Sequence, residues 1–356
     1  MDLEFFSQSL AEICAHSLVS PGRSLRPVVI ANPKAGGFTI HSRWNEHLKT
    51  LHEYRQKAAL NPLRKIYGGS DLILTDGKGS AEKITLSLIK EAEKDPAPFY
   101  LIITAGGDGT SLEVLSGMYN APAHIRSNFA VLRLPMGTGN DSADSIHLAG
   151  ALDLLINPAH VKFAPALRLV TAPGGAACKK GSGLAFNILS VGLDAYVTHM
   201  ANIMKGKFPG NSYKLWVDIA AIFYDRVYKV DYIDVRLLDQ QNREIRSFRE
   251  KLLLLAMGVS GMRTYGAGKK ILPDEHNVCA IKQTSLFGKI AIKKLVVSGM
   301  HTSHKDAMFL NAHRVEFSGS SPILVQMDGE TMLLQPEDFP AAIELTAPVI
   351  PLLCAS

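Results

Sequence analysis

Three short segments of the chain combine glycine with residues that carry charge or hydrogen-bonding groups. They are NPKAGG from Asn32, GGDGTS from Gly106 and PMGTGND from Pro135, and a weaker fourth, TDGKG, begins at Thr75. Each follows a run of apolar residues that predicts a buried strand, such as YLII at 100–103. Glycine-rich turns of this kind leave backbone N–H groups exposed. Next to a helix N-terminus, such groups bind anions, phosphate in particular.

A single turn of this kind also has a simpler interpretation. Asp108 or Thr110 could do no more than cap the helix predicted from Ser111 to Met118. Four turns after four strands argue for more, because the carboxyl ends of parallel strands meet along one edge of a sheet. We therefore expect the four turns to line one phosphate-binding edge. Neither a GxxxxGK[ST] stretch nor a GxGxxG after the first strand occurs in the sequence, which excludes those two nucleotide motifs.

A pair of carboxylates appears late in the chain, in Asp328-Gly329-Glu330. Two carboxylates around a glycine, after a strand, suit a Mg²⁺ held through nucleotide phosphates or a general base for a hydroxyl. Asp-Gly is also a strong hairpin signal, so the residues alone leave a plain β-turn open.

Strands and helices alternate through the first part of the chain. A polar helix is predicted at about 42–59, and a second helix after Gly79 has an apolar side formed by Ala81, Ile84, Leu88, Ile89 and Ala92. This alternation is typical of a parallel sheet with helices on its faces. After Asp153 short β-rich runs favour an antiparallel sandwich or split barrel.

We include IKKLVVSG at 292–299 among these β-rich runs and predict one helix in the second part, at about 213–224. The last apolar stretch is expected to return to the first domain. The predicted fold class is thus α/β plus β. Its parts are an N-terminal extension over 1–26, a doubly wound parallel sheet over 27–152 with about 335–356, and a β-rich domain over 153–334.

The order and spacing of NPKAGG, GGDGT, PMGTGND and the late DGE resemble the catalytic domain of the diacylglycerol kinase and sphingosine kinase family, especially its bacterial lipid kinases. The resemblance extends over about Pro27 to Gln335. The GGDGT segment is shared with NAD kinases and phosphofructokinases, whereas the first turn, GTGND and DGE narrow the match. The resemblance implies a first domain of the NAD kinase and phosphofructokinase type, with ATP in the cleft between two domains. It also implies Mg²⁺ and the hydroxyl of a lipid, such as diacylglycerol, as phosphate acceptor.

The resemblance also implies roles for matching residues. Nucleotide binding would fall to Asn32, Pro33, Lys34, Ala35, Gly36, Thr75, Gly106, Gly107, Asp108, Gly109, Thr110, Ser111 and Thr138. Catalysis would involve Asp108, which assists the metal or the attacking hydroxyl, and Glu330, which accepts the hydroxyl proton. Asp328 and Glu330 would hold the metal, and Asp141 and Asp194 would face the lipid substrate. Glu113 matches an acidic position near the metal in sphingosine kinases, but a capping or solvent-facing role is equally open.

The sequence departs from the bacterial members after Pro273. There the family carries an Asp-Gly that helps to hold a structural magnesium, whereas this chain has DEHNV. This departure keeps an alternative open, a catalytically silent protein that binds nucleotide or lipid and regulates a partner. An NAD or sugar kinase on the same scaffold is a second alternative. It is disfavoured because the downstream Asn-Glu pair of NAD kinases has no counterpart here.

Composition limits the classes of ligand and site that the chain can have. The 356 residues carry a net charge of +5, which is compatible with a phosphorylated ligand or an anionic membrane surface and selects neither. The four cysteines lack a CxxC pair, which argues against a disulfide framework or a zinc site. An amphipathic face over Phe5–Leu18 is expected to dock on the protein itself rather than on a membrane. We expect a cytoplasmic protein that contacts the inner face of a membrane peripherally and has no nucleic-acid partner. The sequence leaves homo-oligomer formation open.

Overall fold

The computed structural model describes the chain from Asp2 to Ala355 except residues 21, 65, 67–70, 138, 142, 176–182, 206–223, 225–229 and 267. Two predictions therefore lie outside the described residues: the role of Thr138, and the helix at 213–224 apart from Tyr224. The chain divides into two compact units. The first comprises Met1–Pro165 and Ala347–Ser356, and the second comprises Ala166–Thr346.

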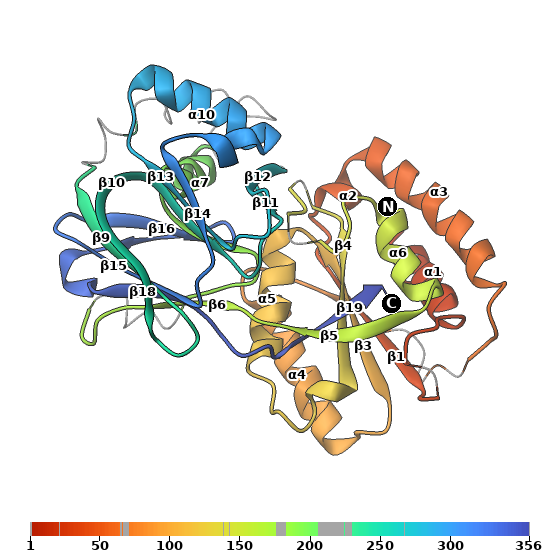
Figure 1. Ribbon diagram of the computed structural model, residues 1–356. Coiled ribbons are helices and arrows are strands. Elements are labelled where there is room, and N and C mark those ends of the chain that lie inside the picture. Colours follow the sequence, from red (N-terminus) through yellow and green to blue (C-terminus); the bar gives the residue numbers. More distant parts are fainter. Residues whose placement is uncertain are drawn as a thin grey trace. The chain divides into compact units, whose positions relative to one another are not determined.

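The first unit is built on a six-stranded sheet in the order β2-β1-β3-β4-β19-β5 (Figure 1). The strands are β1 (Leu25–Ala31), β2 (Asp71–Leu74), β3 (Phe99–Gly106), β4 (Phe129–Pro135), β5 (Ala159–Ala164) and β19 (Ile350–Ala355). Neighbouring strands pair in parallel except β19 with β5, which pair antiparallel. The predicted parallel sheet is confirmed.

Helices cover both faces of this sheet. On one side lie α1 (Leu3–Cys14), α3 (His41–Ala58) and α6 (Leu148–Ile156), with the short α2 (Gly36–Thr39) before α3. On the other side α4 (Ser80–Lys94) packs on α5 (Asp108–Tyr119) so closely that a Cβ on Gly117 would lie 2.8 Å from the Cβ of Thr85. The short η1 (Arg126–Asn128) precedes β4. This is the doubly wound arrangement that alternating strands and helices predict.

The N-terminal helix packs on its own unit, as the sequence predicts. Phe6, Leu10 and Ile13 of α1 are completely buried, and the ring of Phe6 meets the ring of Phe38 edge-on at 5.1 Å between centroids. Because its apolar face is covered, α1 has none left for a membrane. No helix in the described part of the chain is long and apolar enough to cross a bilayer.

The second unit is an eleven-stranded sheet whose strand pairs are antiparallel, as predicted. Its strands are β6 (Leu167–Val170), β7 (Gly183–Ala185), β8 (Ile188–Gly192), β9 (Tyr232–Leu238), β10 (Glu244–Gly258), β13 (Val278–Lys282), β14 (Ala307–Leu310), β15 (Arg314–Gly319), β16 (Ile323–Met327), β17 (Glu330–Leu334) and β18 (Ala341–Leu345). The first half of β10 pairs with β9, and its second half pairs with β8 and β13. The sheet thereby encloses a core that includes Val191, Val235, Leu255 and Phe317.

The remaining elements of this unit are the hairpin β11 (Arg263–Tyr265) and β12 (Lys269–Leu272), the helices α7 (Leu193–Lys205) and α10 (Leu286–Ser298), and the 3-10 turns η3 (Met300–Ser303) and η4 (Pro336–Asp338). The prediction of a strand at 292–299 is wrong, because those residues continue α10. Ser285 caps the start of the helix by accepting the N–H of Gly288, and Gly299 ends it at φ +78°. These end signals outweigh the β-branched residues between them.

The unit boundaries also differ from the predicted ones. The first unit runs to Pro165 rather than to residue 152, because β5 pairs with β19 and not with the second sheet. At the other end, the return to the first unit begins at Ala347 rather than near 335, because β18 pairs with β15 and β6.

Candidate functional site

The glycine turns follow the carboxyl ends of four adjacent parallel strands. The turn from Asn32 follows β1, the turn from Thr75 follows β2, and the turns from Gly106 and Pro135 follow β3 and β4. Because the strand order is β2-β1-β3-β4, the four turns lie along one edge of one sheet. The expected common edge is therefore confirmed.

Three of these turns touch through their backbones. The N–H of Gly37 donates to the carbonyl of Met136 at 2.8 Å, and a Cβ on Gly37 would lie 3.0 Å from the Cα of Met136. A Cβ on Gly137 would lie 2.5 Å from the Cα of Gly107. Only glycine permits such approaches, so these positions explain the composition of the turns.

The turn after β4 is held by two side chains. Asn140 has φ +57°, accepts the N–H of Gly137 at 2.7 Å through its side-chain oxygen, and donates to the carbonyl of Pro135 at 3.2 Å. Arg43, from α3, donates to the carbonyl of Gly137 at 3.1 Å. Sequence analysis missed Arg43 because no local motif connects a helix residue to a turn so distant in sequence.

Two carboxylates converge beside this turn. A Cβ on Gly139 would lie 2.9 Å from Oδ2 of Asp108 and 3.5 Å from Oδ2 of Asp141. Gly139 thus lies next to the carboxylates of the turns after β3 and β4. Carboxylate oxygens are the ligands that Mg²⁺ prefers, together with water and phosphate, so Asp108 and Asp141 are of the residue type that would hold a divalent cation. Among the described residues no group of three or more His, Cys, Asp and Glu side chains is placed to hold a metal. A cation here would take its remaining ligands from water or from a bound phosphate.

The other residues of the second turn have structural contacts. A Cβ on Gly106 would lie 2.4 Å from the hydroxyl oxygen of Thr110, so Thr110 packs directly on the turn. The hydroxyls of Ser111 and Thr104 lie 3.0 Å apart in a hydrogen bond, and Ser111 is 3 % exposed. The N-cap residue of α5 is Gly107, with no side-chain capping hydrogen bond, so the capping alternative for Asp108 or Thr110 is not supported. Gly109 lies at the exposed start of α5. The backbone groups of the turn are the parts left to meet a phosphate.

The turns after β1 and β2 are arranged more simply. Asn32 accepts the N–H of Lys34 through its side-chain oxygen at 3.0 Å, which leaves the Lys34 side chain exposed at the sheet edge after Pro33. Ala35 precedes α2, which begins at Gly36. Thr75 donates its N–H to the carbonyl of Ala31 at 2.9 Å, which ties the β2 turn to β1.

Glu113 binds a neighbouring helix. Its Oε1 accepts the N–H of Gly79 at 2.6 Å, and its Oε2 accepts the N–H of Ala81 at 3.0 Å. The carboxylate thereby satisfies unpaired donors at the N-terminus of α4, where negative charge is favoured. These are the contacts expected of Glu113 in a capping role.

In the second unit, Asp328 and Gly329 form the two-residue loop between β16 and β17, with φ +47° and +103°. Positive φ at both positions is typical of a type I′ turn. The Asp328 carboxylate accepts N–H groups from Phe186, Asn187 and Ile188, the last at 2.9 Å. Both its oxygens are used in this way. The Asp328 carboxylate thereby anchors the hairpin to the start of β8. The metal-ligand role expected for Asp328 and Glu330 stays a prediction.

Asp194 lies in the first turn of α7, next to a buried polar network. Its Oδ2 accepts the hydroxyl of Ser190 at 2.7 Å and the amide of Gln326 at 3.3 Å. Gln326 is completely buried and also accepts the N–H of Gly329 at 3.1 Å through its Oε1. Gln326 therefore links Asp194 to the Asp328-Gly329 turn. Sequence analysis missed Gln326 because it lies within an apolar strand.

Glu330 is the exposed first residue of β17 and pairs with Met327. The groups near it come from α7: Asn202 donates to the carbonyl of Gly329 at 2.8 Å, and a His199 ring nitrogen lies 3.2 Å from the Thr331 hydroxyl. Glu330 and Asp194 thus belong to one polar region of the second unit, joined through the hairpin. Asp108 and Asp141 belong to the first unit.

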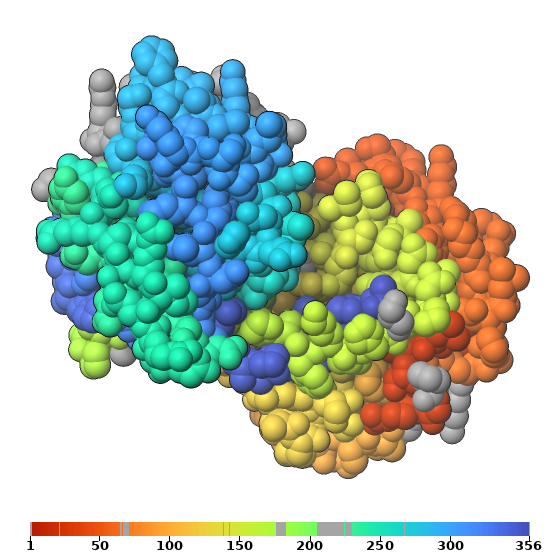
Figure 2. Space-filling view, in the orientation of Figure 1, coloured from red at the N-terminus to blue at the C-terminus, as the bar shows by residue number. Residues whose placement is uncertain are grey.

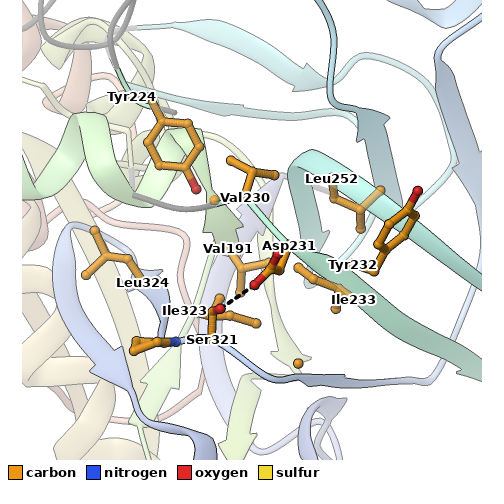
Figure 3. A pocket seen from close by; sticks show the side chains of 13 residues that line it. Val191, Tyr224, Val230, Asp231, Tyr232, Ile233, Leu252, Ser321, Ile323 and Leu324 are labelled. Atoms are coloured by element: carbon orange, nitrogen blue, oxygen red, sulfur yellow. Dashed lines mark hydrogen bonds between the residues drawn. The ribbon is translucent and has the colours of Figure 1, made fainter. Parts of the chain in front are cut away.

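Each unit has a cavity among its described residues. In the first unit a cavity of about 400 Å³ lies beside the third turn, between Arg43, His47 and Asn140 on one side and the segment 146–149. Burial lowers the pKa of His47, so its ring is held neutral at neutral pH. In the second unit a cavity of about 30 Å³ is lined mainly by apolar residues, and Ser321 donates to the Asp231 carboxylate there (Figure 3).

The fold places the protein in a known structural class. A crystal structure of a diacylglycerol kinase from Bacillus anthracis str. Sterne aligns with a TM-score of 0.55 at 17% identity, over 92% of this chain and 96% of that one. A second structure from the same strain aligns with a TM-score of 0.60 at 18% identity, over 94% and 96% of the two chains. At such identities the likeness establishes the shared two-domain fold and nothing further.

Sequence comparisons indicate which protein family the chain resembles. Residues 26–161 match the model of the diacylglycerol kinase catalytic domain, a range that contains all four glycine turns. Residues 26–161 thus resemble this catalytic domain, and the resemblance predicted from the motifs is confirmed. Curated diacylglycerol kinases of Staphylococcus epidermidis and Bacillus subtilis are 23% and 24% identical to it. They match 70% and 68% of this chain, and 74% of each relative is covered.

Proposed function

We propose that the protein is an ATP-dependent lipid kinase that transfers the γ-phosphoryl group of ATP to the hydroxyl of a lipid such as diacylglycerol. The observation that carries the proposal is the convergence of three glycine turns at one sheet edge beside Asp108 and Asp141, within a range that matches the diacylglycerol kinase catalytic domain. Backbone N–H groups at such an edge suit a triphosphate. The relatives named above are diacylglycerol kinases, which favours a lipid hydroxyl as acceptor.

In this proposal the first unit binds the nucleotide. The turns from Asn32 and Gly106 would hold the phosphates through N–H groups, with Lys34 and Thr75 at the same edge. Asp108 and Asp141 would hold a Mg²⁺ that neutralises charge on the transferring oxygens when it is bound. The rigid backbone contacts of Gly107 and Gly137 support this role, because donors fixed before binding need no reorganisation during transfer.

The second unit would supply the proton acceptor. Glu330 would take the proton of the lipid hydroxyl as its oxygen bonds to the γ-phosphorus. The bond from that phosphorus to the β–γ bridging oxygen breaks, and ADP leaves. Its place beside the anchored Asp328-Gly329 turn supports this assignment, since a base must be held in position to act. Asp194, held by Ser190 and Gln326, would face the lipid.

The test is transfer of radiolabelled γ-phosphate from ATP into a total lipid extract, followed by separation of the products. Transfer into lipid supports the proposal, and the labelled product distinguishes diacylglycerol from a sphingoid base, phosphatidylglycerol or an isoprenoid alcohol. Label in NAD or in a sugar would instead favour a different kinase on this scaffold. Stabilisation of the protein by ATP and Mg²⁺ without any transfer would favour the silent regulatory alternative that the DEHNV segment keeps open. We also propose that the protein works in the cytoplasm and reaches its lipid at the inner face of a membrane.

A further inference from the structure

Helix α10 of the second unit has apolar side chains on both of its faces. Ile292 is 4 % exposed and packs into the unit with Val296. On the opposite side Phe287 is 82 % exposed and Val297 is 53 % exposed. A surface helix of a globular protein normally has polar residues on its outer side. An outer side this apolar is typical of a surface that meets a partner.

The exposed residues form one continuous face. Leu286, Ile290 and Val297 are spaced so that they lie along one side of the helix, and Phe287 lies beside them. Met300, just after the helix, adds a further side chain that is 64 % exposed. We call the following set of residues the α10 face: Leu286, Phe287, Ile290, Lys293, Lys294, Val297 and Met300. Figure 2 shows α10, in light blue, on the outer surface of the second unit.

Positive charge accompanies these apolar residues. From Gln283 to Lys305 the sequence has four lysines and neither Asp nor Glu, and of the four only Lys289 is buried, at 6 % exposure. Lys293 and Lys294 are exposed on the α10 face itself. Lys270 adds a fifth positive charge, since its side chain runs against the end of the helix, where a Cβ on Gly299 would lie 2.9 Å from its Cδ.

The face is formed before any partner arrives. Caps at Ser285 and Gly299 define both ends of α10, and its inner side is packed in the unit. A partner would therefore meet an ordered surface, and binding would not require the helix to fold.

We propose that the α10 face docks on the surface of an anionic lipid bilayer. Lysines beside exposed apolar side chains are the pattern that inserts into the boundary between headgroups and acyl chains, where the lysines meet anionic lipid. A second copy of this chain is a poorer occupant, because a two-fold contact through this face would place lysines opposite lysines. The inference rests on the membrane contact of the proposed function and names the surface that would make it. Its readout is binding without turnover, so either proposal can fail without the other.

The experiment is co-sedimentation of the full chain with vesicles in the absence of ATP. We expect binding to vesicles with roughly 30% phosphatidylglycerol in phosphatidylcholine, and much weaker binding to phosphatidylcholine alone or in about 0.5 M NaCl. Phe287→Ser should lower the partition coefficient about tenfold, because a phenylalanine side chain leaves the bilayer boundary. Lys293→Glu with Lys294→Glu should lower it at least tenfold on anionic vesicles, at roughly a factor of five for each lysine lost.

The matched control is Leu63→Ser in the first unit. Leu63 is 76 % exposed, close to the exposure of Phe287, and lies outside the α10 face. This variant should bind vesicles as the wild type does. In addition, Phe287→Trp should show a blue shift of its fluorescence and quenching by brominated lipid when anionic vesicles are added. The two native tryptophans are subtracted with the unsubstituted chain.

Three results would overturn the proposal. The first is equal binding of the wild type to anionic and neutral vesicles, and the second is unchanged binding of Phe287→Ser. The third is sedimentation of the free chain as a dimer that Phe287→Ser turns into a monomer, which would assign the face to a second copy. Unchanged circular dichroism and thermal unfolding of the variants would show that the losses do not come from misfolding.

Discussion

Gly107 and Gly137 lie in turns after neighbouring strands and approach so closely that a Cβ on Gly137 would lie 2.5 Å from the Cα of Gly107. The same Cβ would lie 2.9 Å from the Oδ1 of Asn140, which accepts the Gly137 N–H. The two turns therefore lie in direct backbone contact, with no room for a side chain at Gly137. In the same pair of turns, the carboxylates of Asp108 and Asp141 both lie close to Gly139.

The first prediction concerns Gly137→Ala. The added methyl group must push Gly107 or Asn140 away, and such overpacking costs about 1–3 kcal/mol of unfolding free energy. Urea denaturation of the variant should show that loss. Stabilisation by ATP with Mg²⁺ should also shrink, because the displaced turns no longer present their N–H groups together. Gly109→Ala is the contrasting change, since its Cβ would meet nothing within 4 Å. Equal stability of Gly137→Ala and the wild type would contradict the close contact.

The second prediction concerns Glu330→Gln. The amide keeps the size of the side chain but cannot accept the hydroxyl proton, so phosphate transfer should fall about 10²–10⁴-fold. Glu330 is exposed and lies on the second unit, so neither stability nor stabilisation by ATP should change. The measurement pairs a transfer assay with a thermal shift. Transfer at the wild-type rate would remove Glu330 from the role of base.

The third prediction concerns Asp328→Asn. Asparagine tolerates the positive φ of this turn position, but its NH₂ group cannot accept the backbone N–H groups now bound by one carboxylate oxygen. A lost charge-assisted bond and an unpaired donor should cost about 1–3 kcal/mol in urea unfolding. The turnover number should fall as well, because Glu330 comes directly after this turn.

A control for this change is Asp239→Asn. Asp239 also accepts backbone N–H groups, from Gln241 and Arg243, but in an exposed turn. It should lose less stability and no activity. If Asp328→Asn were as stable and as active as the wild type, Asp328 would not be an anchor.

The fourth prediction separates the two roles considered for Glu113. Glu113→Gln keeps one acceptor oxygen but removes the charge at the N-terminus of α4, which should cost about 0.5–2 kcal/mol. The Mg²⁺ concentration that gives half-maximal transfer should stay the same, since the carboxylate is bonded to Gly79 and Ala81. A several-fold rise in that concentration would instead indicate that Glu113 acts near the metal.

The positions of the four turns could be predicted because strand, glycine turn and helix start are local signals in the sequence. The hydrogen-bond partners of the Asp328 and Glu113 carboxylates could not be predicted in this way. The partners of Asp328 lie at 186–188 and those of Glu113 lie at 79–81, and which N–H groups meet a carboxylate depends on tertiary packing. The sequence at 292–299 predicts a strand because Ile, Val and Leu occur in strands as well as in helices. Only the caps of α10 distinguish the two states. The contacts of Gln326 and Arg43 likewise depend on tertiary packing, so no local sequence pattern predicts them.

The fifth prediction concerns acid stability and His301 of the second unit. The ring is completely buried, 5.1 Å from the ring of Phe309 between centroids, with Nε2 3.2 Å from the carbonyl of Ile271. Its pKa is lowered from the ordinary value of 6.5, chiefly by burial, with a smaller effect of His304 in the same direction. Contacts with the backbone of Ile271 and Leu295 and the charge of Asp274 oppose this shift.

Because the folded state binds this proton less readily than the unfolded state, the stability contributed by neutral His301 is full above pH 6.5. It is lost progressively as the pH falls below that value toward the lowered pKa. The free energy of unfolding of the wild type should therefore fall between about pH 7.5 and about pH 5.5. His301→Gln, which does not titrate, should be less stable at the higher pH but should lose less between the two. Urea denaturation at both pH values measures this difference, and an equal loss in wild type and variant would show that other groups cause the acid sensitivity.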